Sequence, residues 1–472
     1  MDRANHSKLN RRDWLKAATL SGAAAVFGSD HAQGQHEKRK QTQVRGVIFM
    51  VSDGMSPGVL TLAQAYSELT RRRGTEWWSL MNEKTVARGL MDTAAANSMV
   101  TDSAAASTAW GGGERVNNGS ININPAGKSL SSIGEILKKS RARVGLVSTA
   151  TITHATPAGF AANVADRNDE DAIASQYLDR VDVLLGGGSK FFDASTRADG
   201  RDLFGDFKKS GYGIVRDRQG LLTSRDEKLL GTFTAGHLPY TIDRDQNPDI
   251  AVRIPTLSEM TTAALNRMLA GDPPFLLQVE GARIDHAAHF NDIAALLHDQ
   301  LAFDDAIATV RSLIAGRSDV LVVVTSDHGN SNPGLTGMGK NYKDSNQSFA
   351  HIQNMKSSYE ALFVEWTENR GKSTAQLTEM VRRRLGFILK PEQAGVLIEV
   401  FENRPVVEWN EHLKNTEGVL GQLAGNHTGI GWNSTTHTSD PTLINAFGPE
   451  ADRFSGIVRN TDVFGHLTDL LI

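Results

Sequence analysis

The stretch 279–289 holds residue types that could bind a metal ion and do chemistry with it. A carboxylate and an imidazole stand four residues apart at Asp285 and His289, so a helix after Ile284 would place both on one face. Such a pair suits zinc, and Glu280, five residues earlier, could reach a different ion. A charged loop with satisfied histidines is the alternative for this stretch taken alone.

Three predicted strands end in such residues. The apolar run 275–279 leads into Glu280, the run 44–51 leads into Asp53, and the run 320–325 leads into Asp327 and His328. Ligand sites of open α/β sheets lie at the carboxyl ends of strands. Random surface polarity explains three such ends poorly, so we interpret them as one site.

Further strand candidates at 144–147 and 181–185 alternate with helical patterns. This alternation predicts an α/β fold, a mostly parallel central sheet flanked by helices on both faces. Residues 331–420 break the pattern, with helical segments at 374–385 and 391–401, and we interpret them as an insertion outside the sheet. The arginines at 382–384 are typical of a solvated helix face, although such a run also occurs in nucleic-acid-binding proteins.

Composition excludes several classes of protein and site. A chain of 472 residues with a net charge of −4 has no global attraction to nucleic acid or anionic membrane, and no segment predicts a membrane span. The chain has no cysteine, so its metal sites must use carboxylate, imidazole and hydroxyl ligands.

The N-terminus resembles a twin-arginine export signal. Arg11 and Arg12 precede Trp14 and a mild apolar run at 17–28. We therefore separate residues 1–38 from the folded domain, 39–472, and expect a periplasmic or secreted protein exported by the twin-arginine route. A disordered basic tail is the alternative.

Ser103 stands just before an alanine-rich helical stretch, after Thr101 and Asp102. Backbone N–H groups at a helix start favour an anionic phosphoryl group. Taken alone, the serine is better explained as the helix N-cap. No Gly-x-Ser-x-Gly elbow is present, so acyl hydrolysis has no support.

Taken together, these motifs resemble the alkaline phosphatase family. They occur in one order along nearly the whole chain: Asp53, Thr101-Asp102-Ser103, His154-Ala155-Thr156, Arg167, Glu280, Asp285, His289, Asp327-His328 and Thr436-His437-Thr438. The resemblance implies hydrolysis of phosphate monoesters to alcohol and inorganic phosphate, which also inhibits, through a phosphoserine at a two-zinc centre with a third, magnesium site.

The resemblance also implies the role of each residue. It implies one zinc held by Asp285, His289 and His437, a second held by Asp53, Asp327 and His328, and a magnesium held by Asp53, Thr156 and Glu280. Ser103 would be the nucleophile, Arg167 would clamp two phosphate oxygens, and Asp102 would steer that guanidinium.

Two positions depart from the best-studied bacterial pattern, which has aspartate at His154 and lysine at His286. Histidine beside the third site weakens its preference for a hard cation, so the third ion could be magnesium or zinc. We expect both side chains to act around the ligands rather than as ligands. No motif includes the remaining histidines His237, His298, His351, His412 and His427, which we interpret as ordinary polar residues.

Two other functions remain compatible with these motifs. A phosphodiesterase or phosphonate hydrolase of the same superfamily would keep the paired metals, but Arg167, Thr156 and Glu280 favour the monoesterase. A non-catalytic metal- or phosphate-binding protein would not need Ser103 beside Asp102. Members of the family that the chain resembles are commonly homodimers, so we expect a homodimer in which 331–420 forms a crown-like module at the interface or the active-site rim.

Overall fold

The structure is a computed structural model, which describes residues 43–368, 372–404, 406 and 410–472. The export segment expected at 1–38 lies outside the described residues. Residues from 43 onward fall in one compact unit. Within this described part, no helix is both long enough and apolar enough to cross a membrane.

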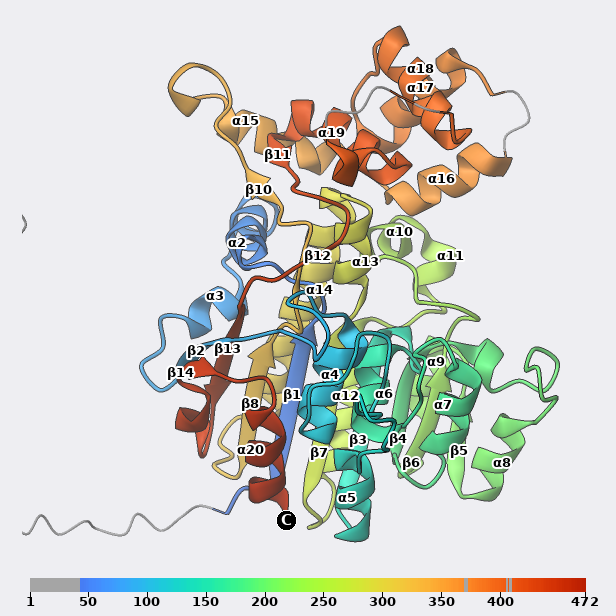
Figure 1. Cartoon of the computed structure of the whole chain (residues 1–472), viewed down its shortest axis with the longest axis vertical. Helices are drawn as coiled ribbons and strands as arrows, with labels where there is room; N and C mark the ends of the chain where they lie inside the picture. Colours follow the sequence, from blue (N-terminus) through green and yellow to red (C-terminus); the bar gives the residue numbers. More distant parts are fainter. Residues whose placement is uncertain (1–42, 369–371, 405, 407–409) are drawn as a thin grey trace, which may run out of the picture. The chain divides into compact units, whose positions relative to one another are not determined.

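A ten-stranded sheet lies at the centre of the described chain (Figure 1). Its order is β14–β2–β13–β8–β1–β7–β3–β4–β6–β5, and all neighbours are parallel except that β13 is antiparallel to β2 and β8. In sheet order the strands are Gly456–Val458, Ala87–Met91, Thr442–Phe447, Val320–Thr325, Gly46–Ser52, Phe275–Gly281, Arg143–Thr151, Val183–Gly187, Lys228–Thr232 and Tyr212–Val215. The predicted mostly parallel sheet is confirmed.

Helices cover both faces of this sheet, each with its own apolar cluster. One face carries α2 Pro57–Arg71, α3 Glu76–Leu80, α9 Arg218–Thr223, α10 Thr241–Gln246, α11 Pro248–Ala251, α12 Leu257–Leu269, α13 Arg283–His289 and α14 Ile293–Leu313. The other carries α4 Ser103–Gly112, α5 Ile133–Lys139, α6 Ala155–Ala161, α7 Glu170–Tyr177, α8 Leu203–Lys209 and α20 Asp462–Leu471. Short 3₁₀ turns, η1 Ser189–Phe191 and η5 Ala451–Phe454, complete these layers.

Three central strands bring the predicted ligands to one edge of the sheet. Strands β1, β7 and β8 are buried along their whole length, as expected for parallel strands covered on both faces. Val51 in β1 is in register with both Glu280 in β7 and Thr325 in β8. Asp53 and Asp327 each follow two residues beyond that level, so the three carboxylates lie at the same carboxyl edge.

The insertion expected at 331–420 corresponds to residues 334–431 of the structure, which we call the inserted segment. It leaves and rejoins the domain through a short ribbon. Strand β10 Gly334–Leu335 pairs antiparallel with β11 Ile430–Gly431. Between them lie η2 Lys340–Tyr342, α15 Ser345–Ala350, η3 His351–Asn354, α16 Tyr359–Glu368, α17 Thr374–Leu385, α18 Pro391–Phe401, η4 Glu411–Leu413 and α19 Thr416–Thr428. These helices gather beyond one end of the central sheet (Figure 1). The helices predicted at 374–385 and 391–401 are confirmed.

A second small ribbon brings the C-terminal motif to the site. Strand β12 His437–Thr438 pairs antiparallel with β9 Gly329–Asn330, with His437 opposite Asn330. Because β9 directly follows His328, this pairing brings His437 beside the end of β8. The stacked rings of His328 and His437 have centroids 3.7 Å apart.

Candidate metal and phosphate site

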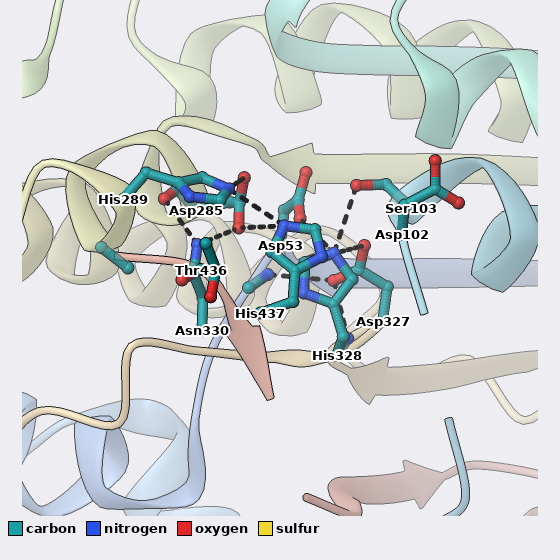
Figure 2. Close-up of polar contacts among 12 residues, drawn as sticks. Asp53, Asp102, Ser103, Asp285, His289, Asp327, His328, Asn330, Thr436 and His437 are labelled. Carbon is teal, nitrogen blue, oxygen red and sulfur yellow. Dashed lines mark hydrogen bonds and ion pairs between the residues drawn. The ribbon is translucent and has the colours of Figure 1, made fainter. Parts of the chain in front are cut away.

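The side chains predicted as ligands converge at the carboxyl edge of the sheet, where Figure 2 shows carboxylate and imidazole groups facing one another. Three overlapping groups have ligand atoms within 4.8 Å of one another. These groups are Asp285, His328 and His437; Asp53, Asp327 and His328; and Asp53, His154 and Glu280. His328 and Asp53 each belong to two groups, so the groups form one continuous centre.

At one end of this centre, two imidazoles and a carboxylate face the same point. The His289 Nε2 lies 3.0 Å from the His437 Nε2 and 3.3 Å from Asp285 Oδ2. The Nδ1 atoms of the two rings lie 2.7 Å and 2.8 Å from the carbonyl oxygens of Thr435 and Thr101. Since a carbonyl only accepts, each Nδ1 carries hydrogen, and both Nε2 lone pairs of the neutral rings would point inward.

Two such lone pairs and a carboxylate need a positive charge between them. Burial disfavours the imidazolium, but the charge of Asp285 outweighs this and raises the pKa of His289 to about 9. Burial, together with nearby His328, lowers the pKa of His437 to about 4. A divalent cation could replace the proton on His289, and metal binding to imidazole releases protons in this way.

In the middle of the centre, His328 faces two carboxylates. Its Nε2 lies 3.1 Å from Asp327 Oδ2 and 3.7 Å from Asp53 Oδ1. Backbone N–H groups of Gly54 and His328 donate to the other oxygen of Asp327, which fixes the carboxylate plane. Burial, reinforced by the charge of Asp327, raises the pKa of Asp53 well above its ordinary range.

The third group is richer in oxygen. Glu280 accepts a hydrogen bond from the Ser148 hydroxyl on Oε2, at 2.5 Å, while its Oε1 has no partner. Burial raises the pKa of Glu280 to about 7. Thr156 lies at the start of α6, and its buried Oγ1 also has no hydrogen-bond partner. His154, immediately before α6, reaches this group with a ring nitrogen.

Unpartnered buried atoms show that this centre fits metal ions. Burying a carboxylate oxygen without a partner is costly, so native proteins rarely leave several together. At this centre the buried atoms with no hydrogen-bond partner are Asp53 Oδ1 and Oδ2, His154 Nδ1, Thr156 Oγ1, Glu280 Oε1 and Asp327 Oδ2. The five oxygens among these atoms are donors of the kinds that bind zinc and magnesium.

Ser103 lies beside this centre as the first residue of α4. The N-cap of α4 is Asp102, whose Oδ1 accepts from the Ala105 N–H, so the alternative that Ser103 is the cap is wrong. The Ser103 hydroxyl is free to point elsewhere and lies 3.2 Å from His328 Nε2 (Figure 2). The serine is 1% exposed, at a helix start where backbone N–H groups favour anions.

Arg167 is held at the same helix start. Its Nη1 donates to Asp102 Oδ2, at 3.1 Å, and its Nη2 donates to His154 Nε2, at 3.0 Å. The same Asp102 oxygen accepts from the Gly119 N–H. Asp102 therefore caps α4 and orients the guanidinium at once, which holds a planar cation against the residue that precedes Ser103.

His237 is a correction to the sequence interpretation, which took it as an ordinary polar residue. Its ring centroid lies 4.6 Å from that of His286 and 5.7 Å from that of His154. His154 and His286 are 5.6 Å apart, so the three rings form a histidine cluster beside Arg167. Nothing local in the sequence marks His237, because it lies on a loop 83 residues from His154 and 49 from His286.

Asn330 is a further polar contact that the sequence interpretation missed. Its Nδ2 donates to Asp285 Oδ1 at 2.7 Å and to the Asp285 carbonyl at 3.2 Å (Figure 2). In turn its Oδ1 accepts from the Ser331 hydroxyl. Its position two residues after His328, in the polar run that ends β8, was the available signal.

Comparisons with known proteins agree along the whole described chain. A family model described as alkaline phosphatase matches residues 44–471. Alkaline phosphatase 4 of Bacillus subtilis is 30% identical over 461 residues, covering 95% of this chain and 94% of that protein. Streptomycin-6-phosphate phosphatase of Streptomyces griseus is 32% identical over 513 residues, covering 98% of each.

The solved structures agree as well. The crystal structure of Thermus thermophilus alkaline phosphatase matches with a TM-score of 0.85 at 33% identity, covering 95% of this chain and 96% of that chain. The structure of a cold-active alkaline phosphatase from Shewanella sp. matches with a TM-score of 0.72 at 28% identity, covering 90% of this chain. Fold, family model and relatives together show that the chain is a phosphomonoesterase and belongs to the alkaline phosphatase family.

Proposed function

We propose that this phosphomonoesterase forms a phosphoserine at Ser103 and hydrolyses it at a centre of two zinc ions and a third, magnesium or zinc, ion. The proposal rests on one observation above all. Buried oxygens of Asp53, Glu280 and Asp327 have no hydrogen-bond partner, and the Ser103 hydroxyl lies 3.2 Å from the Nε2 atom of His328, which faces Asp53 and Asp327. A surface that only recognised phosphate would have no need of buried, unpartnered carboxylates.

Each ion would have its own set of residues. Asp285, His289 and His437 would hold one zinc, Asp53, Asp327 and His328 the second, and Asp53, Thr156 and Glu280 the third ion. When bound, paired divalent cations stabilise charge on the attacking and leaving oxygens of an in-line displacement. The oxygen donors of the third group suit magnesium. His154 Nε2 accepts from Arg167, so the hydrogen of the neutral ring is on Nδ1 and His154 would lie beside this ion without being its ligand. A histidine beside the site weakens its preference for a hard cation, so the third ion could also be zinc.

The chain's own residues divide the remaining work. Arg167 would hold two phosphate oxygens with its planar fork, and Asp102 keeps that fork in place. The Ser103 oxygen bonds to phosphorus while the bond from phosphorus to the alcohol oxygen breaks, and the departing alcohol takes up a proton. A water oxygen then bonds to phosphorus, the bond to Ser103 breaks, and the serine regains its proton. Two inversions at phosphorus give net retention.

Hydrolysis of an aryl phosphate monoester and of the matching diester would test this function. We expect monoester hydrolysis to dominate, because a monoester can present two non-bridging oxygens to Arg167 and a third to the bound ions, whereas a diester has only two. We also expect acid quenching during turnover to yield a peptide phosphorylated at Ser103. Faster diester hydrolysis would favour the phosphodiesterase reading, and phosphoserine at another position would overturn the assignment of the nucleophile.

Two sequence expectations extend this proposal. We propose export by the twin-arginine route, supported by Arg11, Arg12 and the apolar run after them. Replacing both arginines by lysine should retain the protein in the cytoplasm, and unchanged export would contradict this route. We also propose a homodimer in which the inserted segment forms part of the interface or the active-site rim. Light scattering that gives the mass of one chain would contradict the dimer.

A further inference from the structure

Arg283, the first residue of α13, is a buried cation that the proposed mechanism does not use. Its side chain is 3% exposed, and its guanidinium carbon lies 3.7 Å from the centroid of the Tyr240 ring. Nη1 donates to His286 Nδ1, at 2.8 Å, and Nη2 donates to Glu360 Oε2, at 2.7 Å. Each terminal nitrogen of the guanidinium therefore has its own acceptor, one in the site and one in the inserted segment.

The contact with Arg283 fixes which nitrogen of His286 carries hydrogen. A guanidinium has only donors, so Nδ1 of His286 must present a lone pair to it. The ring is then neutral with its hydrogen on Nε2, because an imidazolium would turn an N–H toward the arginine N–H. Nε2 lies across the ring from Nδ1, so it presents its hydrogen on the side away from Arg283.

His237 shows the same pattern within the histidine cluster. The backbone N–H of Thr151 donates to His237 Nδ1, at 3.1 Å, which leaves its hydrogen on Nε2. His286 and His237 thus each offer an N–H group close to His154, the ring that contacts Arg167. N–H donors beside an arginine favour an anion.

Glu360 belongs to the inserted segment. The two residues before it, at the start of α16, form hydrogen bonds with the rest of the domain. Ser358 donates to Asp243 from both its N–H, at 2.9 Å, and its hydroxyl, at 2.5 Å. The Tyr359 N–H donates to Asp292 Oδ2, at 2.6 Å. Glu360 follows directly, so its carboxylate is presented to Arg283 from a fixed helix start.

We propose that Arg283, anchored by Glu360 of the inserted segment, is a positioning residue that fixes His286 as an Nε2–H donor beside the phosphate clamp. The inserted segment then orders part of the phosphate site. This inference rests on the proposed function for the identity of the bound anion. The hydrogen position on His286 follows from the contacts alone.

Substitutions at two glutamates of α16 separate this role from general stability. Glu360→Gln removes the charge that holds Arg283, and Glu360 is 46% exposed, so the variant should fold. Glu365→Gln is the matched control, because Glu365 lies on the same helix but pairs with Arg383 and Arg384 inside the inserted segment. Arg283→Lys is the stronger test, since a single ammonium group lacks the planar fork that serves both acceptors.

Nitrogen-15 NMR of histidine-labelled protein reads the proton position directly, with the His286 signal identified by its loss in His286→Gln. We expect the Nε2–H form in the wild type and in Glu365→Gln, and a mixture of forms in Glu360→Gln and Arg283→Lys. The inhibition constant for inorganic phosphate should rise by roughly two- to tenfold in the latter two, the value of one hydrogen bond.

Two results would overturn the inference. One is an unchanged His286 proton position in both Glu360→Gln and Arg283→Lys, and the other is an equal rise in the phosphate inhibition constant in Glu365→Gln. If the proton position shifts as expected but the wild type does not hydrolyse monoesters, the proposed function fails and the positioning role of Arg283 stands. Circular dichroism melting of each variant confirms that folded proteins are being compared.

Discussion

Two sets of buried carboxylates in this molecule are equally hidden from solvent but differ in their partners. The unpaired set, Asp53, Glu280 and Asp327, is at most 1% exposed, and each member has at least one oxygen with no hydrogen-bond partner. The amide-bound set, Asp292, Asp299 and Asp304, is at most 4% exposed. In that set every carboxylate oxygen accepts a hydrogen bond.

The pKa alone would not separate these sets. Burial raises the pKa of Glu280 to about 7, and it does the same for Asp292 and Asp299. The difference lies in what surrounds the oxygens, because Asp292 caps α14 and Asp304 accepts from the N–H groups of Glu76 and Trp77. Buried carboxylates bound to amides hold loops and helices in place, whereas unpaired ones require a cation.

The largest expected effect is on catalysis and leaves both sets of carboxylates untouched. Ser103→Ala should lower turnover of an aryl phosphate by on the order of a thousandfold or more, because the attacking oxygen is lost. Metal content should stay at the wild-type level, since Ser103 supplies no charge to the centre. Ser107→Ala on the same helix is the control, and its phosphoenzyme should still form. Near-normal turnover in Ser103→Ala would refute the nucleophile.

A change in the unpaired set should remove metal but not fold stability. Loss of a residue that only hydrogen-bonds to a metal ligand typically weakens metal binding by roughly 10–100-fold. Asp53 would be a ligand itself, so Asp53→Asn should weaken metal binding by more than this, and activity should fall as metal is lost. The metal-free variant should melt no lower than the metal-free wild type, because a buried carboxylate whose oxygens have no hydrogen-bond partner is replaced by a neutral amide. If Asp53→Asn binds as many metal ions as the wild type, the distinction between the unpaired and the amide-bound carboxylates is contradicted.

A change in the amide-bound set should have the opposite outcome. Asp292→Ala leaves the N–H groups of Ala294, Ala295 and Tyr359 without an acceptor, so we expect a loss of about 2–4 kcal/mol in the free energy of unfolding. Metal content should not change. Asp169→Ala, which removes the more exposed cap of α7, should cost only about 1 kcal/mol. Metal loss at full stability in Asp292→Ala would contradict the structural role.

The smallest effect concerns pH. Burial raises the pKa of Asp299 from its ordinary 3.8 to about 7, so the folded state holds the proton more tightly than the unfolded state. The stability that protonated Asp299 contributes to the folded state is fully present below pH 3.8, and it is lost as the pH rises toward 7. Asp299→Asn keeps an acceptor for the Thr241 N–H. Between pH 4 and pH 8, the free energy of unfolding of this variant should rise relative to that of the wild type by on the order of 1–2 kcal/mol. If the free energies of unfolding of the wild type and of Asp299→Asn change with pH in parallel, the raised pKa of Asp299 is contradicted.

The parts of the molecule that could be predicted from sequence are those with local signals. The central strands β1, β7 and β8 are unbroken apolar runs with polar ends, so both the strands and the residues that follow them could be recognised. Strands β2, β5, β6 and β14 were not predicted, because they are short or carry exposed or glycine positions, and β13 was not predicted either. The antiparallel insertion of β13 between β2 and β8 depends on pairing across more than a hundred residues, for which periodicity gives no signal.

The same limit applied within the site. Asp285 and His289 share a helix face and could be paired from spacing alone. His237 and Glu360 reach the site from a loop and from the inserted segment, and neither stands in a motif. Their contacts with His286 and Arg283 depend on how distant elements pack, which residue spacing does not record.

Metal analysis of the purified, dialysed full chain tests the central distinction most directly. We predict three divalent ions per chain, two of them zinc, and we predict that strong chelation removes both the ions and monoester hydrolysis and lowers the melting temperature. Activity should return when zinc and magnesium are added together. A protein free of metal that retains full activity and an unchanged melting temperature would contradict the claim that unpaired buried carboxylates mark a metal centre.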